Sequence, residues 1–176
     1  LDIVINSLKK MNCKGLNITI PFKQKVFDYC HEISPVAKQL KAINTLKLKD
    51  NKIWSGTNTD IDGFIYPLKN INLIKKTAMV LGSGGAARSV IQGLINLKLS
   101  KITIISRNKN SLNELITNFK NDTIIEGLLN TNPKIDNLIQ ETDLIVNTTP
   151  VGMSKMKNDD ELPFGESLSL IHISEP

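Results

Sequence analysis

Residues 77–97 read T-A-M-V-L-G-S-G-G-A-A-R-S-V-I-Q-G-L-I-N-L, and this stretch predicts the fold of the longer part of the chain. A short apolar strand runs into a glycine turn, and a helix is predicted to follow from about Ala86 to Leu97. The turn fits G-x-G-x-x-A, a pattern that lets a pyrophosphate approach backbone amides at a helix N-terminus. Glycine turns also have purely structural uses, but this position between strand and helix favours dinucleotide binding.

Strands and helices continue to alternate after this stretch. Apolar segments predict strands over residues 102–106, 123–125 and 143–147. A helix is predicted over 112–119, with Ser111 as its N-cap and Glu114 as the partner of a capping box. The βαβαβ order predicts a parallel, doubly wound sheet of the Rossmann type.

The end of the second strand indicates which dinucleotide is bound. An NAD site usually carries Asp or Glu here to bind the ribose 2′-hydroxyl, but this chain has Ser106, Arg107, Asn108 and Lys109. Arginine can stack on adenine and grip a 2′-phosphate, and the lysine adds positive charge. An ordinary basic loop is the alternative, but the missing acid favours NADP.

The first sixty residues have a different organisation. Helical spacing of apolar residues predicts a helix over 1–11, a buried strand is predicted over 14–20, and Pro21 suits the first turn of a helix over 22–29. Ser34-Pro35 starts another helix, and a hairpin is predicted from strands 43–49 and 52–55. A helical connection follows, and we place the boundary between two domains after Asp60.

Composition limits the possible functions. The chain has 176 residues, of which 40% are hydrophobic and 22% charged, and its net charge is +5. The lysines are scattered and aromatic residues are few, which favours a solvated surface over a nucleic-acid site. Neither a membrane-spanning run nor a signal-peptide pattern is present, so we expect a cytoplasmic location and a small-molecule substrate. Cys13 and Cys30 lack the spacing of metal ligands, so we expect no metal.

Three polar residues upstream are candidates for chemistry. Lys23 follows the strand and Pro21, where loop residues often carry function. Taken alone, Lys23 could be a surface lysine, Asp60 a helix cap and Asn44 a strand-end residue. A lysine and an aspartate next to a nicotinamide site favour hydride transfer between an alcohol and a ketone.

Five motifs follow one another along the chain: N-I-T-I-P-F-K, A-I-N-T-L, G-T-N-T-D-x-x-G, G-S-G-G-A-A-R-S and N-T-T-P-V-G-M. Their order and spacing resemble those of the shikimate dehydrogenase family. The resemblance implies that Lys23 and Asp60 are the catalytic pair and that both also bind substrate, together with Thr19 and Asn44. The implied cofactor-binding residues are Gly82, Ser83, Gly84, Gly85, Ala86, Ser106, Arg107, Asn108, Lys109, Asn147, Thr148, Thr149 and Met153. Ser106 and Asn108 depart from the family's Asn-Arg-Thr clamp for NADP, and Arg107 retains it.

By this resemblance the fold class is α/β, with residues 1–60 as an N-terminally truncated α/β substrate domain. Residues 61–167 are an incomplete Rossmann-like NADP-binding domain. The implied reaction is NADP-dependent, reversible reduction of 3-dehydroshikimate to shikimate, in the shikimate pathway of aromatic amino-acid biosynthesis. The sequence leaves open which of Lys23 and Asp60 transfers the proton. Alternatives are a quinate/shikimate dehydrogenase of broader specificity, a methylenetetrahydrofolate dehydrogenase, or a catalytically dead dinucleotide-binding fragment.

The ends of the chain depart from the family. Its Ser-x-Ser segment for the substrate carboxylate would precede Leu1, and its substrate-contacting glutamine would follow the last residue. We therefore expect an internal fragment that is inactive as given. Residues 168–176, L-S-L-I-H-I-S-E-P, resemble the translation of a transposase sequencing adapter. A packed strand is the alternative, but the resemblance favours a non-native tail in which His172 has no catalytic role.

Overall fold

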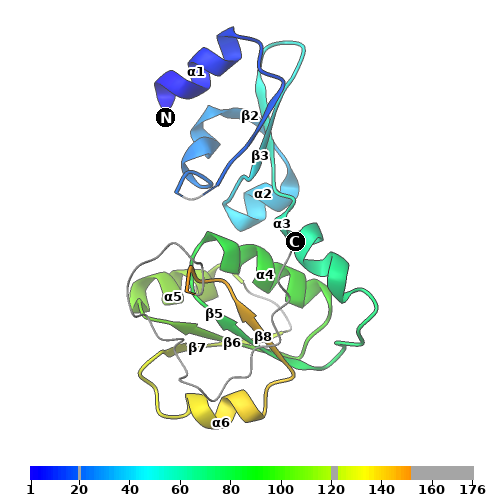
Figure 1. The fold of residues 1–176 in the computed structure, drawn as a ribbon, viewed down its shortest axis with the longest axis vertical. Coiled ribbons are helices and arrows are strands. Elements are labelled where there is room, and N and C mark those ends of the chain that lie inside the picture. Colours follow the sequence, from blue (N-terminus) through cyan, green and yellow to red (C-terminus); the bar gives the residue numbers. More distant parts are fainter. Residues whose placement is uncertain (20, 120–122, 152–176) are drawn as a thin grey trace.

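The computed structural model describes residues 1–19, 21–119 and 123–151. Its two halves are each built on a sheet of four strands, with the order β1-β3-β4-β2 in the first and β7-β6-β5-β8 in the second (Figure 1). Met153 and the tail over 168–176 lie outside the described residues. Within those residues, no helix is long and apolar enough to cross a bilayer.

The first sheet is mixed. The predicted hairpin is confirmed as β3 (Thr45–Leu48) paired antiparallel with β4 (Trp54–Thr57), and β1 (Gly15–Asn17) adds to β3. The predicted buried strand over 14–20 is wrong in its burial, because β1 is exposed at both ends and only half-buried at its centre. The prediction also missed β2 (Cys30–Ile33), which pairs parallel with β4 across a register shift.

Helices cover this sheet and fill its core. The predicted helices at 1–11 and after Ser34 are confirmed as α1 (Asp2–Lys10) and α2 (Pro35–Leu40). The helix predicted over 22–29 is shorter, since the chain forms only the 3₁₀ helix η1 (Lys25–Tyr29). Side chains from α1, η1, α2 and the strands then make a core that includes Ile5, Val26, Ala37, Ile43, Leu46 and Trp54.

The second sheet is parallel throughout its described strands. These are β5 (Thr77–Leu81), β6 (Lys101–Ser106), β7 (Ile124–Leu129) and β8 (Leu144–Asn147). The helices between them are α4 (Gly85–Asn96), α5 (Lys109–Thr117) and α6 (Ile135–Gln140). The doubly wound prediction is confirmed, although α6 was not foreseen.

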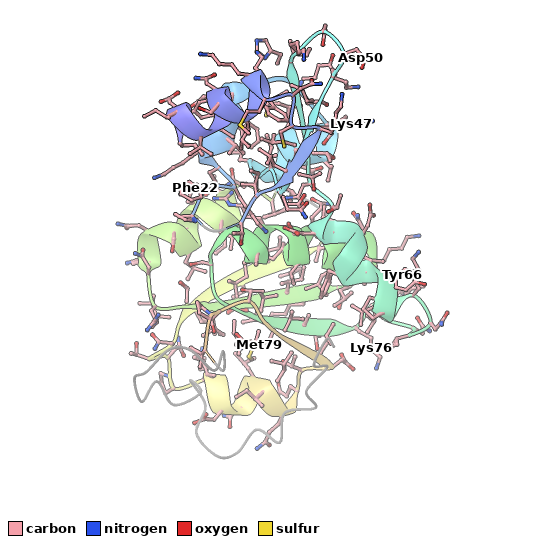
Figure 2. All side chains as sticks on the ribbon, turned by 45° about the horizontal axis from the view of Figure 1, so that its top comes forward. Phe22, Lys47, Asp50, Tyr66, Lys76 and Met79 are labelled. Carbon is pink, nitrogen blue, oxygen red and sulfur yellow. The ribbon has the colours of Figure 1, made fainter. Side chains whose placement is uncertain are left out.

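The side chains of β5 alternate between the two faces of the second sheet, and helices cover both faces. Ala78 and Val80 pack toward the core that contains α4 and α5, whereas Met79 and Leu81 pack on the opposite face with Ile135 of α6. Met79 accordingly lies inside the lower half in Figure 2, whereas the exposed Asp50 lies at the outer tip of the upper half and the exposed Lys47 lies on its side below that tip. A strand buried on both faces needs the continuous apolar run seen in this sequence.

One hydrophobic core joins the two halves. It includes Leu40 and Ala42 from the first half and Val90, Ile91 and Leu94 from α4. Helix α3 (Asp60–Ile65), followed by the 3₁₀ helix η2 (Tyr66–Leu68), packs against α4. At the contact, a Cβ added to Gly93 would lie 2.7 Å from Phe64 Cδ1, so the two helices approach closely. The helix that Asp60 begins and the helix that follows the glycine turn are therefore held together.

Candidate active site

Gly82 makes the sharp turn at the end of β5. Its φ is +104°, a region that side chains other than glycine rarely adopt, and an added Cβ would lie 2.8 Å from Thr148 Oγ1. Thr148 in turn donates to the Leu81 carbonyl from its backbone nitrogen, at 2.9 Å, and from its hydroxyl, at 2.6 Å. The glycine therefore allows the ends of β5 and β8 to approach each other.

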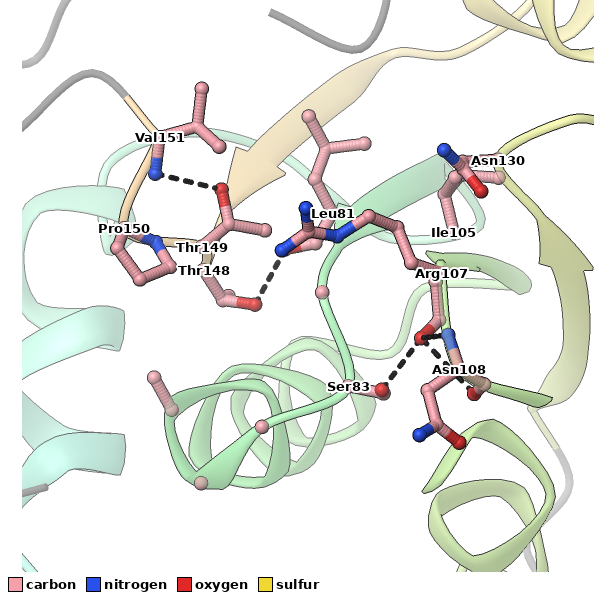
Figure 3. Close-up of a pocket in the computed structure, with 15 residues that line it drawn as sticks. Leu81, Ser83, Ile105, Arg107, Asn108, Asn130, Thr148, Thr149, Pro150 and Val151 are labelled. Carbon is pink, nitrogen blue, oxygen red and sulfur yellow. Dashed lines mark hydrogen bonds between the residues drawn. The ribbon is translucent and has the colours of Figure 1, made fainter. Parts of the chain in front are cut away.

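The next two glycines leave the start of α4 open. Gly84 is the N-cap of the helix and supplies no side-chain cap, and an added Cβ at Gly84 or Gly85 would meet nothing within 4 Å. The first amides of a helix have no intrahelical partner, and they attract anions. They face a cavity of about 500 Å³ (Figure 3). Its wall consists of Leu81, Gly82, Ser83, Gly84, Gly85, Ala86, Ile105, Ser106, Arg107, Asn108, Asn130, Thr148, Thr149, Pro150 and Val151.

The end of β6 forms one wall of this cavity. Ser106 is buried, whereas Arg107 is exposed and lines the cavity. The residues that line the cavity include no Asp or Glu. Asn108 caps α5, because its Oδ1 accepts from the backbone nitrogens of Asn110 and Ser111 at 2.9 and 3.1 Å. Lys109 begins α5 and does not line the cavity.

The predicted capping box of α5 is therefore wrong. Helix α5 begins at Lys109, three residues before the predicted start at residue 112, and Ser111 lies in its first turn. The hydroxyl of Ser111 lies 2.7 Å from that of Ser83 in the glycine turn. Glu114 accepts from the buried Arg88 of α4 at 2.8 Å. Both side chains thus fasten α5 to the glycine turn and its helix.

The loop after β8 forms the opposite wall. Thr148 and Thr149 line the cavity, whereas Asn147 shapes the loop without lining it. The side chain of Asn147 accepts from the Thr149 backbone at 2.9 Å and donates to the Val151 carbonyl at 3.0 Å. Sequence reasoning missed Asn130, which follows β7. Its backbone nitrogen donates to the Ser106 carbonyl at 3.0 Å. Only its place at the carboxyl edge of the sheet pointed to it.

Lys23 and Asp60 meet in the first half of the chain. Lys23 Nζ lies 2.7 Å from Asp60 Oδ2, and their side chains are 17% and 31% exposed. Asn44 Nδ2 donates to the other carboxylate oxygen, Oδ1, at 2.7 Å. Along the chain, Lys23 is 37 positions and Asn44 is 16 positions from Asp60. The fold, and not the local sequence, therefore assembles this cluster.

Neighbouring contacts hold the cluster in place. The Lys23 carbonyl accepts from the Ile43 backbone at 2.8 Å, which fixes the residue before Asn44 against the lysine. The buried Asn58 accepts from the Asp60 backbone at 2.9 Å and donates to the Ala42 carbonyl at 3.0 Å. Thr19 is exposed, and its carbonyl accepts from the Phe22 backbone.

Together these features combine an acid–base pair with a nucleotide-type cavity. A lysine and an aspartate in contact can hold a hydroxyl or carbonyl oxygen of a small molecule and exchange a proton with it. The open helix N-terminus and Arg107 suit a ligand that carries more than one phosphate. This combination fits an oxidoreductase that uses a phosphorylated dinucleotide.

Comparison with known proteins gives consistent matches. The model of the "Shikimate dehydrogenase substrate binding domain" matches residues 1–46, and that of "Shikimate / quinate 5-dehydrogenase" matches residues 68–160. Shikimate dehydrogenase (NADP(+)) of Prochlorococcus marinus subsp. pastoris is 81% identical over 166 residues, covering 94% of this chain and 58% of that protein.

Solved structures agree with these sequence matches. The crystal structure of shikimate dehydrogenase from Aquifex aeolicus has a TM-score of 0.81 at 31% identity, covering 93% of this chain and 57% of that one. Quinate dehydrogenase from Corynebacterium glutamicum, in complex with NAD, has a TM-score of 0.75 at 27% identity, covering 85% and 54%. The chain therefore spans little more than half the length of the relatives it matches.

Proposed function

Because this chain belongs to the shikimate dehydrogenase family, we propose that the protein catalyses the NADP-dependent, reversible reduction of 3-dehydroshikimate to shikimate. The reaction belongs to the shikimate pathway of aromatic amino-acid biosynthesis. The observation that carries the proposal is the contact between Lys23 and Asp60, because it supplies an acid–base pair whose lysine lies within residues 1–46, the part of the chain that matches a substrate-binding domain. We assign residues 1–60 to the substrate domain and residues 61–167 to the NADP domain, in keeping with the two separate sheets.

The cavity beside the glycine turn suits NADP. Gly84 and Gly85 leave space where side chains would stand, so a pyrophosphate can reach the first amides of α4. Arg107 reaches the same cavity and offers a planar guanidinium to a 2′-phosphate. Further lining residues of the cavity that we assign to the cofactor are Ser83, Ala86, Thr148 and Thr149. We also assign Lys109 and Asn147 to cofactor binding, although they do not line the cavity. NADPH, when bound, supplies the hydride.

The residues around Asp60 perform the proton chemistry. Lys23 Nζ exchanges a proton with the C3 oxygen of the substrate. Asp60, 2.7 Å away, orients the ammonium group and shares its charge. Asn44 donates to the far oxygen of the same carboxylate, which turns the near oxygen toward the lysine. The amide of Asn44 and the hydroxyl of Thr19 are the further groups that we assign to the substrate's hydroxyls.

Steady-state kinetics of the whole protein test the proposal. Shikimate and quinate are each offered with NADP⁺ and with NAD⁺, and we expect the highest kcat/KM for shikimate with NADP⁺. A kcat/KM for quinate with NAD⁺ that equals or exceeds this value refutes the assignment. NADP⁺ binding without any turnover in the whole protein favours the inactive, dinucleotide-binding alternative.

The 176-residue chain itself provides a second comparison. It spans 58% of its Prochlorococcus relative, so we expect it to bind NADP⁺ and to turn over shikimate negligibly compared with the whole protein. Robust turnover by the 176-residue chain contradicts this expectation.

A further inference from the structure

Three serine hydroxyls join the glycine turn to the strand end that carries Arg107. Ser83 Oγ lies 2.7 Å from Ser106 Oγ and 2.7 Å from Ser111 Oγ. Ser83 belongs to the turn, Ser106 ends β6 and Ser111 lies in the first turn of α5. Figure 3 shows Ser83 next to the segment that bears Arg107 and Asn108. Ser83 is thus the side chain that connects these two walls of the cavity.

The hydrogen bonds in this cluster close into a ring on Asn108. The Asn108 backbone nitrogen donates to Ser106 Oγ at 3.1 Å, and Ser111 Oγ donates to the Asn108 carbonyl at 3.2 Å. When Ser106 donates to Ser83 and Ser83 donates to Ser111, each of the three hydroxyls donates one hydrogen bond and accepts another. Hydrogen bonds linked in such a chain strengthen one another. The ring fixes the backbone of the residue directly after Arg107.

We propose that Ser83 is a positioning residue for cofactor selection: its hydroxyl sets the separation between the phosphate-binding amides of the glycine turn and the guanidinium of Arg107. This inference rests on the proposed function, because only a cofactor with a 2′-phosphate needs both groups at once. The turn alone serves NAD⁺ and NADP⁺ equally. Loss of the Ser83 hydroxyl therefore weakens NADP⁺ binding more than NAD⁺ binding.

The test is a double-mutant cycle on direct cofactor binding, measured by titration calorimetry with the whole protein. One hydrogen bond is worth about 0.5–1.5 kcal/mol, so Ser83→Ala should weaken NADP⁺ binding roughly two- to tenfold and leave NAD⁺ binding nearly unchanged. In the Arg107→Ala background, Ser83→Ala should have no further effect on NADP⁺. Ser83→Thr, which keeps the hydroxyl, should restore much of the preference.

Ser89→Ala is the matched control. Ser89 lies on α4, the helix that follows the glycine turn, and is 1% exposed. Its hydroxyl has no hydrogen-bond partner among the described residues. We expect parental NADP⁺ binding in this variant, and thermal unfolding of each variant reports whether it folds. Equal weakening of NADP⁺ and NAD⁺ by Ser83→Ala, or additive effects with Arg107→Ala, overturns the inference. Failure of the parent to bind either cofactor would instead refute the proposed function.

Discussion

Replacement of Gly82 by alanine should damage the fold, because the backbone itself requires glycine there. At φ +104° a residue with a Cβ is strained, at a cost of about 1–3 kcal/mol. The new methyl group would also lie 2.8 Å from Thr148 Oγ1, which donates to the Leu81 carbonyl at 2.6 Å. Loss of that hydrogen bond adds about 1 kcal/mol. The free energy of unfolding should therefore fall by about 2–4 kcal/mol in total.

Gly84→Ala separates this effect from cofactor binding. Gly84 has φ −83°, an ordinary value for alanine, and an added Cβ meets nothing within 4 Å. Its free energy of unfolding should change by less than about 1 kcal/mol, the scale of an N-cap substitution. The methyl group would nevertheless occupy the space that we assign to the pyrophosphate, so NADP⁺ binding should be lost.

Urea unfolding of both variants, followed by circular dichroism, and NADP⁺ titration complete this test. We expect Gly82→Ala to lower stability and Gly84→Ala to abolish binding at nearly parental stability. The reasoning is refuted if the two variants unfold at the same urea concentration, or if Gly84→Ala binds NADP⁺ as the parent does.

Three further substitutions test single contacts. Lys23→Ala should lower kcat by about 10²–10⁴-fold with NADP⁺ affinity nearly unchanged, and a near-normal kcat contradicts its role. Arg107→Ala should remove an NADP preference of roughly tenfold or more in kcat/KM, which would be refuted if the parent shows no preference. Hydrogen bonds from Lys76 and Thr77 lower the pKa of Asp143 to about 2, so their stabilisation is present above about pH 4 and is lost as pH falls through 2. Asp143→Asn should flatten this acid dependence in pH-titrated circular dichroism, and an unchanged profile refutes the link.

Local sequence patterns predicted the second half of the fold well. The short apolar strand predicted before the glycine turn is confirmed as β5 (Thr77–Leu81), because a buried parallel strand is a continuous apolar run, here ended by glycine. The start of α5 was wrong by three residues, since Asn108 and Ser111 are both good N-caps. Tertiary contacts decided between them: Ser111 bonds to Ser83 and leaves the cap to Asn108.

The first half was harder because its elements depend on distant partners. Strand β2 pairs with β4 across a register shift and carries no clear alternation, so the segment Cys30–Ile33 gives no local strand signal. The helix predicted after Pro21 is interrupted because the Lys23 carbonyl accepts from the Ile43 backbone. The same contact brings the lysine close to Asp60 and Asn44. The spacing of these residues along the chain did not predict this cluster, whereas the resemblance of the motifs to a known family did.

A crystal structure of the whole protein with NADP⁺ and shikimate tests the central claim most directly, namely that the Lys23–Asp60 pair serves the substrate while the glycine turn and Arg107 serve the cofactor. We predict that the C3 hydroxyl of shikimate lies within hydrogen-bonding distance of Lys23 Nζ, and that the 2′-phosphate contacts the guanidinium of Arg107. The account is contradicted if shikimate binds away from the pair, or if the 2′-phosphate leaves Arg107 without contact.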